Sequence, residues 1–203
     1  MMLMTSAMRT LALTVGANGL PGEWTSGDIG QVGSAGASSE ETGRWVVSGS
    51  GSDIWGTADS FQFAHHELSG DGVLTARIEK LEATDEWAKA GLMVRGSADP
   101  GAAMCMLVAT PLHGVVVQYR PWPGGGCEGN ERWQMVDPPQ WLRLTRTGAT
   151  LTADRSDDGQ TWVRVHRTYI TMPDPVLIGF CVTAHDNGKT ALAVFTDVTL
   201  EGA

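Results

Sequence analysis

The chain has 203 residues and a formal net charge of −9, and it shows no basic stretch suited to nucleic-acid phosphates. It contains no run of about 18 or more apolar residues, so no membrane-spanning helix is predicted. We therefore expect neither nucleic acid nor a membrane as a partner.

Glycine and tryptophan are the unusual components of this sequence. The 26 glycines are about twice the usual share, and 8 tryptophans dominate the aromatic residues. Hydrophobic runs separate the glycine clusters, which indicates tight turns between ordered segments rather than disorder. The length suits a single domain with a substantial core.

The N-terminal segment differs from the rest of the chain. Residues 1–15 contain one cation, Arg9, followed by a short apolar stretch at 11–15. A secretory signal has its basic residues first and a longer apolar region after them, so this segment does not establish secretion. We expect residues 1–18 to be a poorly ordered leader, followed by one β-sandwich domain over residues 19–203.

Short runs rich in Val, Ile, Thr and Trp alternate with turn residues along the whole chain, and no segment has a convincing helical pattern. Strands are predicted, in chain order, at 23–30, 44–48, 60–66, 72–80, 88–95, 102–110, 114–120, 131–135, 140–147, 150–156, 161–168, 176–184 and 191–201. So many short strands predict an all-β fold with two packed sheets.

Alternation along the segments 87–95, 114–120 and 178–185 places one apolar set toward the core and a mixed set on the other face. The mixed set comprises Trp87, Lys89, Met93, Arg95, Gln118, Arg120, Thr183 and His185. One interpretation is an ordinary solvated sheet face. A second interpretation is a ligand-binding surface that stacks on sugar rings and forms hydrogen bonds with their hydroxyls. The combination of aromatic rings with long hydrogen-bonding groups favours this second interpretation.

Several segments, in order over roughly residues 20–201, resemble one known family. They are SGSGSDIWGTADSF (48–61), DEWAKAGLMVR (85–95), GVVVQYR (114–120), WLRLTRTG (141–148), SDDGQTW (156–162) and IGFCVTAHDNG (178–188). The family is the concanavalin-A-like lectin/glucanase superfamily, in its branch of uncharacterised bacterial domains related to the yeast regulator-of-enolase protein. These domains often occur attached to secreted glycosidases.

The resemblance implies a two-sheet antiparallel jelly-roll sandwich with a concave face, an association with carbohydrates, and an extracellular or periplasmic location. Two features depart from the family pattern. One is the pair His65–His66, where an aliphatic–aromatic pair is more usual, and the other is the added loop PWPGGGCE at 121–128. The loop lies where it could reshape the rim of a ligand site. Fold alone does not establish function.

The three cysteines allow at most one intramolecular disulfide. Cys105 and Cys181 lie in apolar, strand-like runs and are expected to be buried thiols, whereas Cys127 lies in a glycine-rich loop. No Cys or His spacing suggests zinc. Asp53 and Asp59, in a Ser- and Gly-rich loop, are the candidate ligands for a calcium ion, with turn hydrogen bonds as their alternative role. No other cofactor is expected.

Hydrolysis of a glycosidic bond needs two suitably placed carboxyl groups. Among the clustered acids, Asp85 alone shares the alternation of Trp87 and Lys89 and could reach the mixed face. Lys89 beside His185 could instead abstract a proton, as in a polysaccharide lyase. Asp85, Lys89 and His185 are therefore the catalytic candidates. Asp158–Gly159, by contrast, predicts a structural hairpin turn.

The leading hypothesis from the sequence is a non-catalytic carbohydrate-recognition module. Its expected contact residues are Trp87, Lys89, Arg95, Gln118, Arg120 and His185, with Trp55 or Trp122 at the rim. Trp87 would stack on a sugar, and the cations would recognise any carboxylate on it. The alternatives are a glycan-cleaving enzyme, a glycoside hydrolase or polysaccharide lyase, that uses the same groove, and a module that binds a protein partner.

Overall fold

The computed structural model describes residues 19–133 and 136–202, so the leader expected at 1–18 lies outside the described residues. The described residues contain strands and no helix, which confirms the all-β prediction. The strands are β1 (Thr25–Ile29), β2 (Ala37–Glu41), β3 (Arg44–Gly49), β4 (Ile54–Trp55), β5 (Ala58–Asp59), β6 (Phe61–Leu68), β7 (Gly72–Leu81), β8 (Lys89–Arg95), β9 (Met104–Thr110), β10 (Gly114–Arg120), β11 (Glu128–Trp133), β12 (Gln140–Thr147), β13 (Thr150–Ser156), β14 (Val163–Tyr169), β15 (Val176–Thr183) and β16 (Ala191–Gly202).

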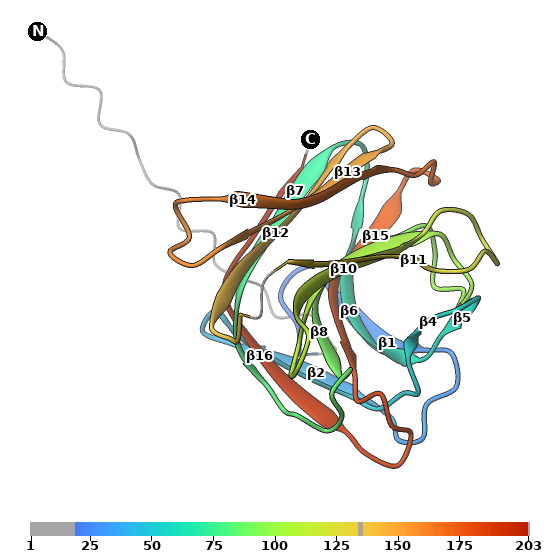
Figure 1. Cartoon of the computed structure of the whole chain (residues 1–203), viewed down its shortest axis with the longest axis vertical. Helices are drawn as coiled ribbons and strands as arrows, with labels where there is room; N and C mark the ends of the chain where they lie inside the picture. Colours follow the sequence, from blue (N-terminus) through green and yellow to red (C-terminus); the bar gives the residue numbers. More distant parts are fainter. Residues whose placement is uncertain (1–18, 134–135, 203) are drawn as a thin grey trace, which may run out of the picture.

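Two antiparallel seven-stranded sheets face each other across the core (Figure 1). The front sheet has the order β1-β6-β15-β8-β9-β10-β11, and the back sheet has the order β14-β13-β12-β7-β16-β3-β2. Strands β4 and β5 form a separate hairpin that packs beside the front sheet. This arrangement is the predicted two-sheet sandwich.

The predicted alternation places the apolar sets in the core between the sheets. Ala90, Leu92 and Val94 of β8 are fully buried there, as are Phe180 and Val182 of β15. Trp24, Trp45, Phe180 and Phe195 form an aromatic cluster in this core. Burial of these large rings supplies much of the hydrophobic stabilisation.

The opposite face of the front sheet is partly covered rather than open. A second buried cluster there includes Met93, Met106 and Cys181. The loop that carries β4 and β5 lies over it, since Asp59 N donates to Pro100 O at 3.0 Å and Cys127 N to Gly56 O at 3.0 Å. Part of the face expected to meet ligand is therefore interior.

Three short strands, β2, β4 and β5, are not anticipated by the sequence patterns. Strand β2 has the sequence ASSEE, which lacks the β-branched and aromatic residues typical of strands, and it forms an edge of the back sheet. Strands β4 and β5 contain two residues each. Strand β11 begins at Glu128 rather than Glu131, and the predicted end at Met135 lies outside the described residues. No helix among the described residues is long and apolar enough to cross a membrane.

Candidate functional site

A cavity of about 220 Å³ opens on the outer face of the front sheet, beneath the loop that carries β4. It is lined by Asp53, Trp55, Trp87, Lys89, Gln118 and His185. Five of these residues were expected from the sequence to contact ligand, and the fold brings them together from four separate segments. For Asp53 the sequence suggests calcium ligation or turn hydrogen bonds, and no contact with a glycan. We call this cavity the front pocket.

The loop before β4 takes its shape from one glycine. Gly51 has a φ of +119°, and a Cβ atom there would lie 1.9 Å from the Ser60 carbonyl oxygen. The buried Thr183 hydroxyl oxygen at the end of β15 lies 3.1 Å from both the Gly51 and the Ser60 carbonyl oxygens, and its one proton is shared between these two acceptors. These contacts fix the base of the loop on the front sheet, and the loop then carries Asp53 and Trp55 to the pocket.

Lys89 begins β8 at the floor of the front pocket, with its side chain almost fully buried. Its ammonium donates to Asp53 Oδ1 at 2.5 Å and to the Trp87 carbonyl oxygen at 3.2 Å, and it lies 5.6 Å from the centroid of the Trp87 ring. The ammonium is thus held by acceptors of the protein itself, as the burial of a charge requires.

His185 lies between two carboxylates just after β15. Its Nδ1 is 2.9 Å from Asp85 Oδ1, and its Nε2 is 3.2 Å from Asp53 Oδ2. The residue has a left-handed φ of 57°, which is unusual for a residue with a side chain and marks a position held by its surroundings. The catalytic candidates Asp85, Lys89 and His185 therefore do meet, and Asp53 joins Lys89 to His185.

Gln118 is the pocket residue that has a buried hydrogen-bond acceptor without a partner. Its side chain is buried, with a relative exposure of 4%, and its Oε1 has no hydrogen-bond partner. A buried acceptor without a partner costs free energy comparable to a lost hydrogen bond. A ligand hydroxyl that donates to Gln118 Oε1 would remove this cost.

The tryptophans of the region differ in how freely they can stack on a ligand. The Trp87 ring is stacked on His113, with a centroid separation of 3.6 Å, so one of its faces is covered. Trp55 is 39% exposed and lines the pocket. Trp122 is exposed but is not among the lining residues. Of the two tryptophans expected at the rim, Trp55 therefore lies at the pocket and Trp122 does not.

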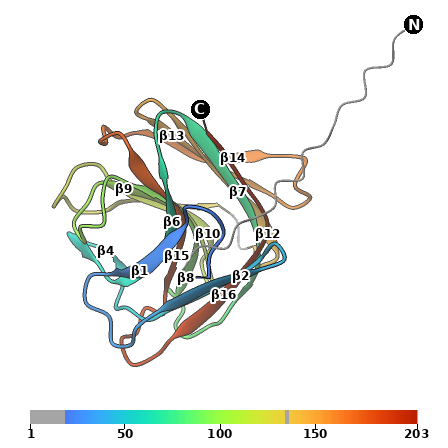
Figure 2. The ribbon, with the colours of Figure 1, turned by 180° about the vertical axis from the view of Figure 1, so that it is seen from behind.

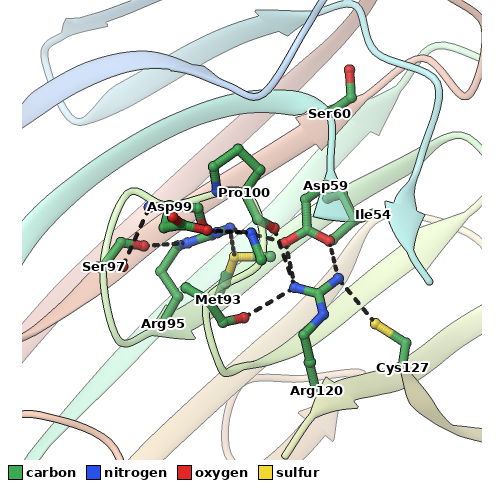
Figure 3. A network of polar contacts seen from close by, with 12 residues as sticks. Ile54, Asp59, Ser60, Met93, Arg95, Ser97, Asp99, Pro100, Arg120 and Cys127 are labelled. Atoms are coloured by element: carbon green, nitrogen blue, oxygen red, sulfur yellow. Dashed lines mark hydrogen bonds and ion pairs between the residues drawn. The ribbon is translucent and has the colours of Figure 1, made fainter. Parts of the chain in front are cut away.

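Arg95 and Arg120, expected to contact ligand, are fully buried around Asp59 (Figure 3). Arg120 donates to both Asp59 oxygens, at 2.5 and 2.9 Å, and Arg95 Nη1 lies 3.3 Å from Asp59 Oδ2. Burial lowers the pKa of Arg95. For Arg120, burial opposes the charge, but the hydrogen bond to Asp59 raises its pKa. We call these three residues the Asp59 network.

The Asp59 network corrects two expectations from the sequence. Arg95 and Arg120 cannot contact a ligand in this structure, because their guanidinium groups are enclosed and occupied by protein acceptors. Asp59 is not suited to calcium, because both of its oxygens face guanidinium groups. Among the described residues, no group of three or more His, Cys, Asp or Glu side chains is arranged to hold a metal ion.

Arg120 also fastens the surrounding loops to one another. Its guanidinium donates to main-chain carbonyl oxygens of three loops, those of Trp55, Gly56, Pro100, Ala102 and Gly125. Because Trp55 is among the residues held, the network positions one wall of the front pocket. Local sequence patterns carry no signal of this role, since Arg120 and Asp59 are 61 residues apart.

A second, larger cavity of about 690 Å³ is lined by residues of β2, β3, β16 and the segment before β1. Figure 2 shows β2 and β16 in the same part of the molecule. The walls of this cavity include the core residues Trp24 and Trp45, and Glu23, Arg44 and Asp197 among its charged residues are exposed. The sequence did not indicate this cavity. The smaller front pocket is the candidate site, because it holds an ion pair with a buried ammonium and an acceptor without a partner.

All three cysteines are free thiols, in agreement with the buried thiols expected at Cys105 and Cys181. Burial raises the pKa of both of these thiols to about 12 and that of Cys127 to about 11. A raised pKa lowers the thiolate fraction, and the thiolate is the reactive form.

We expect the native protein to resist alkylation by iodoacetamide at pH 8. The pKa of Cys127 is raised from 9.0 to about 11. Its thiolate fraction, and with it the labelling rate, should be about 100-fold below that of an unperturbed thiol. Mass spectrometry after timed labelling measures the rate, and labelling in guanidinium chloride should modify all three cysteines quickly. Rapid labelling of Cys127 in the native protein would contradict the raised pKa of this partly buried thiol.

No protein-family model matches the chain, and no curated protein matches it either. Solved structures do resemble it. A functionally unknown protein from Saccharomyces cerevisiae has a TM-score of 0.70 and 17% identity, over 89% of this chain and 97% of that one. The GH43 protein BlXynB from Bacillus licheniformis has a TM-score of 0.62 and 13% identity, over 80% of this chain but only 34% of its own length.

The carbohydrate-binding module CBM66 from Bacillus subtilis is matched over nearly its full length. Its TM-score is 0.56 and its identity 16%, over 89% of this chain and 96% of that one. Identities this low support a common fold and nothing finer. The chain therefore has the two-sheet jelly-roll fold of this carbohydrate-binding module, and it spans about a third of the GH43 protein.

Proposed function

We propose that this chain is a non-catalytic carbohydrate-recognition module that binds part of a glycan in the front pocket. The observation that carries the proposal is the buried, unpartnered amide oxygen of Gln118 in a pocket that also presents the exposed ring of Trp55. Stacking on an aromatic ring together with a few directed hydrogen bonds is how proteins hold sugars, whose rings have apolar faces and hydroxyl edges.

In this proposal each lining residue has a distinct role. Trp55 stacks on the sugar ring, and Trp87 forms the facing wall. Gln118 and Asp53 accept hydrogen bonds from hydroxyl groups, while Lys89 and His185 hold the Asp53 carboxylate in place. With about 220 Å³, the pocket is smaller than the roughly 300 Å³ at which drug-sized ligand sites begin, which favours a short part of a glycan.

The proposal also includes an extracellular or periplasmic location for the protein and its membership of a family of bacterial domains. The resemblance to bacterial domains related to the yeast regulator-of-enolase protein, which often occur attached to secreted glycosidases, supports an extracellular or periplasmic module. The structural likeness to a carbohydrate-binding module and to part of a GH43 protein is consistent with it.

A glycan-cleaving enzyme is the second candidate, because Asp85, His185 and Asp53 lie in one hydrogen-bonded row beside Lys89. Glycoside hydrolysis needs one carboxyl group free to protonate the leaving oxygen and a second to act as nucleophile or base. Here both carboxylates hold His185, and Asp53 also holds Lys89. This use of the two groups favours binding over cleavage.

Native affinity electrophoresis in gels that contain single polysaccharides tests the proposal directly. Retardation by a polysaccharide whose chain length stays unchanged supports a binding module. New reducing ends would indicate a hydrolase, and new ultraviolet absorption from unsaturated ends a lyase. Binding to proteins but to no glycan would replace the proposal with a protein-interaction module.

Replacing Trp55 with Ala should weaken binding of the retarding glycan by at least about tenfold, since aromatic anchors carry a large share of binding energy. The melting temperature should change little, because the contact of Trp55 with Arg120 is made by its main-chain carbonyl. Trp122→Ala is the matched control, an exposed tryptophan outside the pocket. Equal losses of affinity in both variants would place the glycan elsewhere.

A further inference from the structure

We infer that the front pocket accepts neutral, hydroxyl-rich sugars and excludes sugars with a carboxylate or sulfate group at the bound position. The inference rests on the proposed glycan-binding function and concerns the chemical class of the ligand. It reverses the expectation from the sequence, in which Lys89, Arg95 and Arg120 formed a cationic set for an anionic sugar.

The cations that would attract an anion are not available at this pocket. Arg95 and Arg120 are enclosed in the Asp59 network and have no exposed surface. Lys89 is the remaining permanent cation among the lining residues, and its ammonium is bonded to Asp53 and to the Trp87 carbonyl oxygen. The Lys89 side chain is only 2% exposed, so an incoming carboxylate has little access to the ammonium.

The charged groups at the pocket carry no net positive charge. Asp53 lines the pocket, and Asp85 lies directly behind His185, at 2.9 Å from its Nδ1. Asp53 contacts the Lys89 ammonium and the His185 imidazole, and Asp85 contacts the imidazole through its other nitrogen. With a neutral imidazole the group carries one net negative charge, and with a protonated imidazole it carries none. The first state repels an anion, because like charges repel strongly where solvent is partly excluded, and the second state offers an anion no net attraction.

The hydrogen-bonding groups of the pocket point to the same ligand class. Gln118 Oε1 is a buried acceptor without a partner, and the Asp53 carboxylate, 30% exposed, can only accept. A sugar hydroxyl can donate to either of them. A carboxylate or sulfate has no proton to donate, so it would leave Gln118 unsatisfied and place its oxygens against those of Asp53.

Matched neutral and anionic polysaccharides provide the test, with binding to the full chain measured by titration calorimetry. The probes are hydroxyethyl- and carboxymethylcellulose, dextran and dextran sulfate, and methyl-esterified and de-esterified homogalacturonan. We expect the neutral member of a bound pair to bind at least about tenfold more tightly than its anionic counterpart. The difference should shrink as the salt concentration rises, because salt screens the repulsion.

A pair of single-charge variants separates the charge of the pocket from that of the whole protein, whose net charge is −9. Asp85→Asn removes a negative charge behind His185 but keeps an oxygen to accept from the Trp87 amide, a bond of 2.8 Å. Glu201→Gln removes the same charge from an exposed position on β16 of the back sheet. Asp85→Asn should reduce the preference for the neutral member by about threefold or more, and Glu201→Gln should leave it unchanged.

The outcomes distinguish this inference from the proposed function. An anionic member that binds as tightly as its neutral counterpart overturns the inference and leaves a carbohydrate-binding site in place. Equal effects of Asp85→Asn and Glu201→Gln would attribute the preference to overall charge and overturn the role of the pocket. Binding to no polysaccharide of either kind would overturn the inference together with the proposed function.

Discussion

Replacing Asp59 with Asn is expected to lower the free energy of unfolding by about 3–5 kcal/mol. Asp59 is the carboxylate that balances two fully buried guanidinium groups, those of Arg95 and Arg120. Asparagine would leave both cations in the interior without a counter-charge and would direct an NH₂ group at one of them. Removing one partner from a buried ion pair is costly because the remaining charge has lost both water and partner.

Equilibrium urea unfolding measures this loss, with Glu82→Gln as the matched control. Glu82 pairs with Lys80 at 3.4 Å on an exposed surface, where side-chain exposures of 43% and 56% leave both charges hydrated. The control should cost less than about 1 kcal/mol, the usual limit for exposed ion pairs. Similar losses in the two variants would mean that the Asp59 network contributes no more than a surface pair.

The same variant should loosen the loops before it unfolds the sandwich. Arg120 and Asp59 together join the β4–β5 hairpin to the loops at 97–102 and 124–127. Hydrogen exchange should therefore accelerate at the Cys127 amide, which donates to Gly56 O, more than in the core strand β15. A uniform acceleration across the chain would show that the network has no local role.

Phe180→Ala is the second substitution with a large expected effect, a loss of about 3–5 kcal/mol in the free energy of unfolding. Phe180 is fully buried in β15, between Trp24 at 5.4 Å and Phe195 at 4.6 Å, measured between ring centroids. The strands on both sides are paired along their length, so they cannot collapse into the space that the ring leaves. The cost includes the cavity as well as the lost apolar burial.

Thermal and urea unfolding test this prediction, with Tyr169→Ala as the control. Tyr169 is 72% exposed at the end of β14, so its removal should change stability by less than about 0.5 kcal/mol. Trp24 and Trp45 both lie beside Phe180, so the tryptophan emission of Phe180→Ala should also shift to longer wavelength. If Phe180→Ala lowers the free energy of unfolding no more than Tyr169→Ala does, the aromatic cluster does not lie at the centre of the core.

Much of the front pocket could be anticipated from alternation alone. In β8, β10 and β15 side chains alternate between the two faces of the sheet, so Lys89, Gln118 and the segment that ends in His185 could be assigned to the face away from the core. The apolar sets of the same strands confirm this assignment. The prediction succeeds because it depends only on strand geometry, which neighbouring residues along the chain determine.

Alternation could not show which residues of that face remain open. Arg95 shares its strand and its face with Lys89, yet it is covered by the loop that carries Asp59, 36 residues earlier in the chain. The role of Asp53 was missed for the same reason, since nothing near it in sequence indicates Lys89 or His185. Partners so far apart in sequence meet only after the sandwich has formed.

The sequence by itself determined the all-β class, most of the strands, the inward and outward sets of the central strands, and the residues from which a polar site could be built. The tertiary structure alone decided how those residues are used. It buried Arg95 and Arg120 around Asp59, and it left Gln118 and Trp55 at the pocket. The physical reason is that periodicity assigns a side chain to a face, whereas burial depends on which distant loop covers that face and supplies its counter-charges.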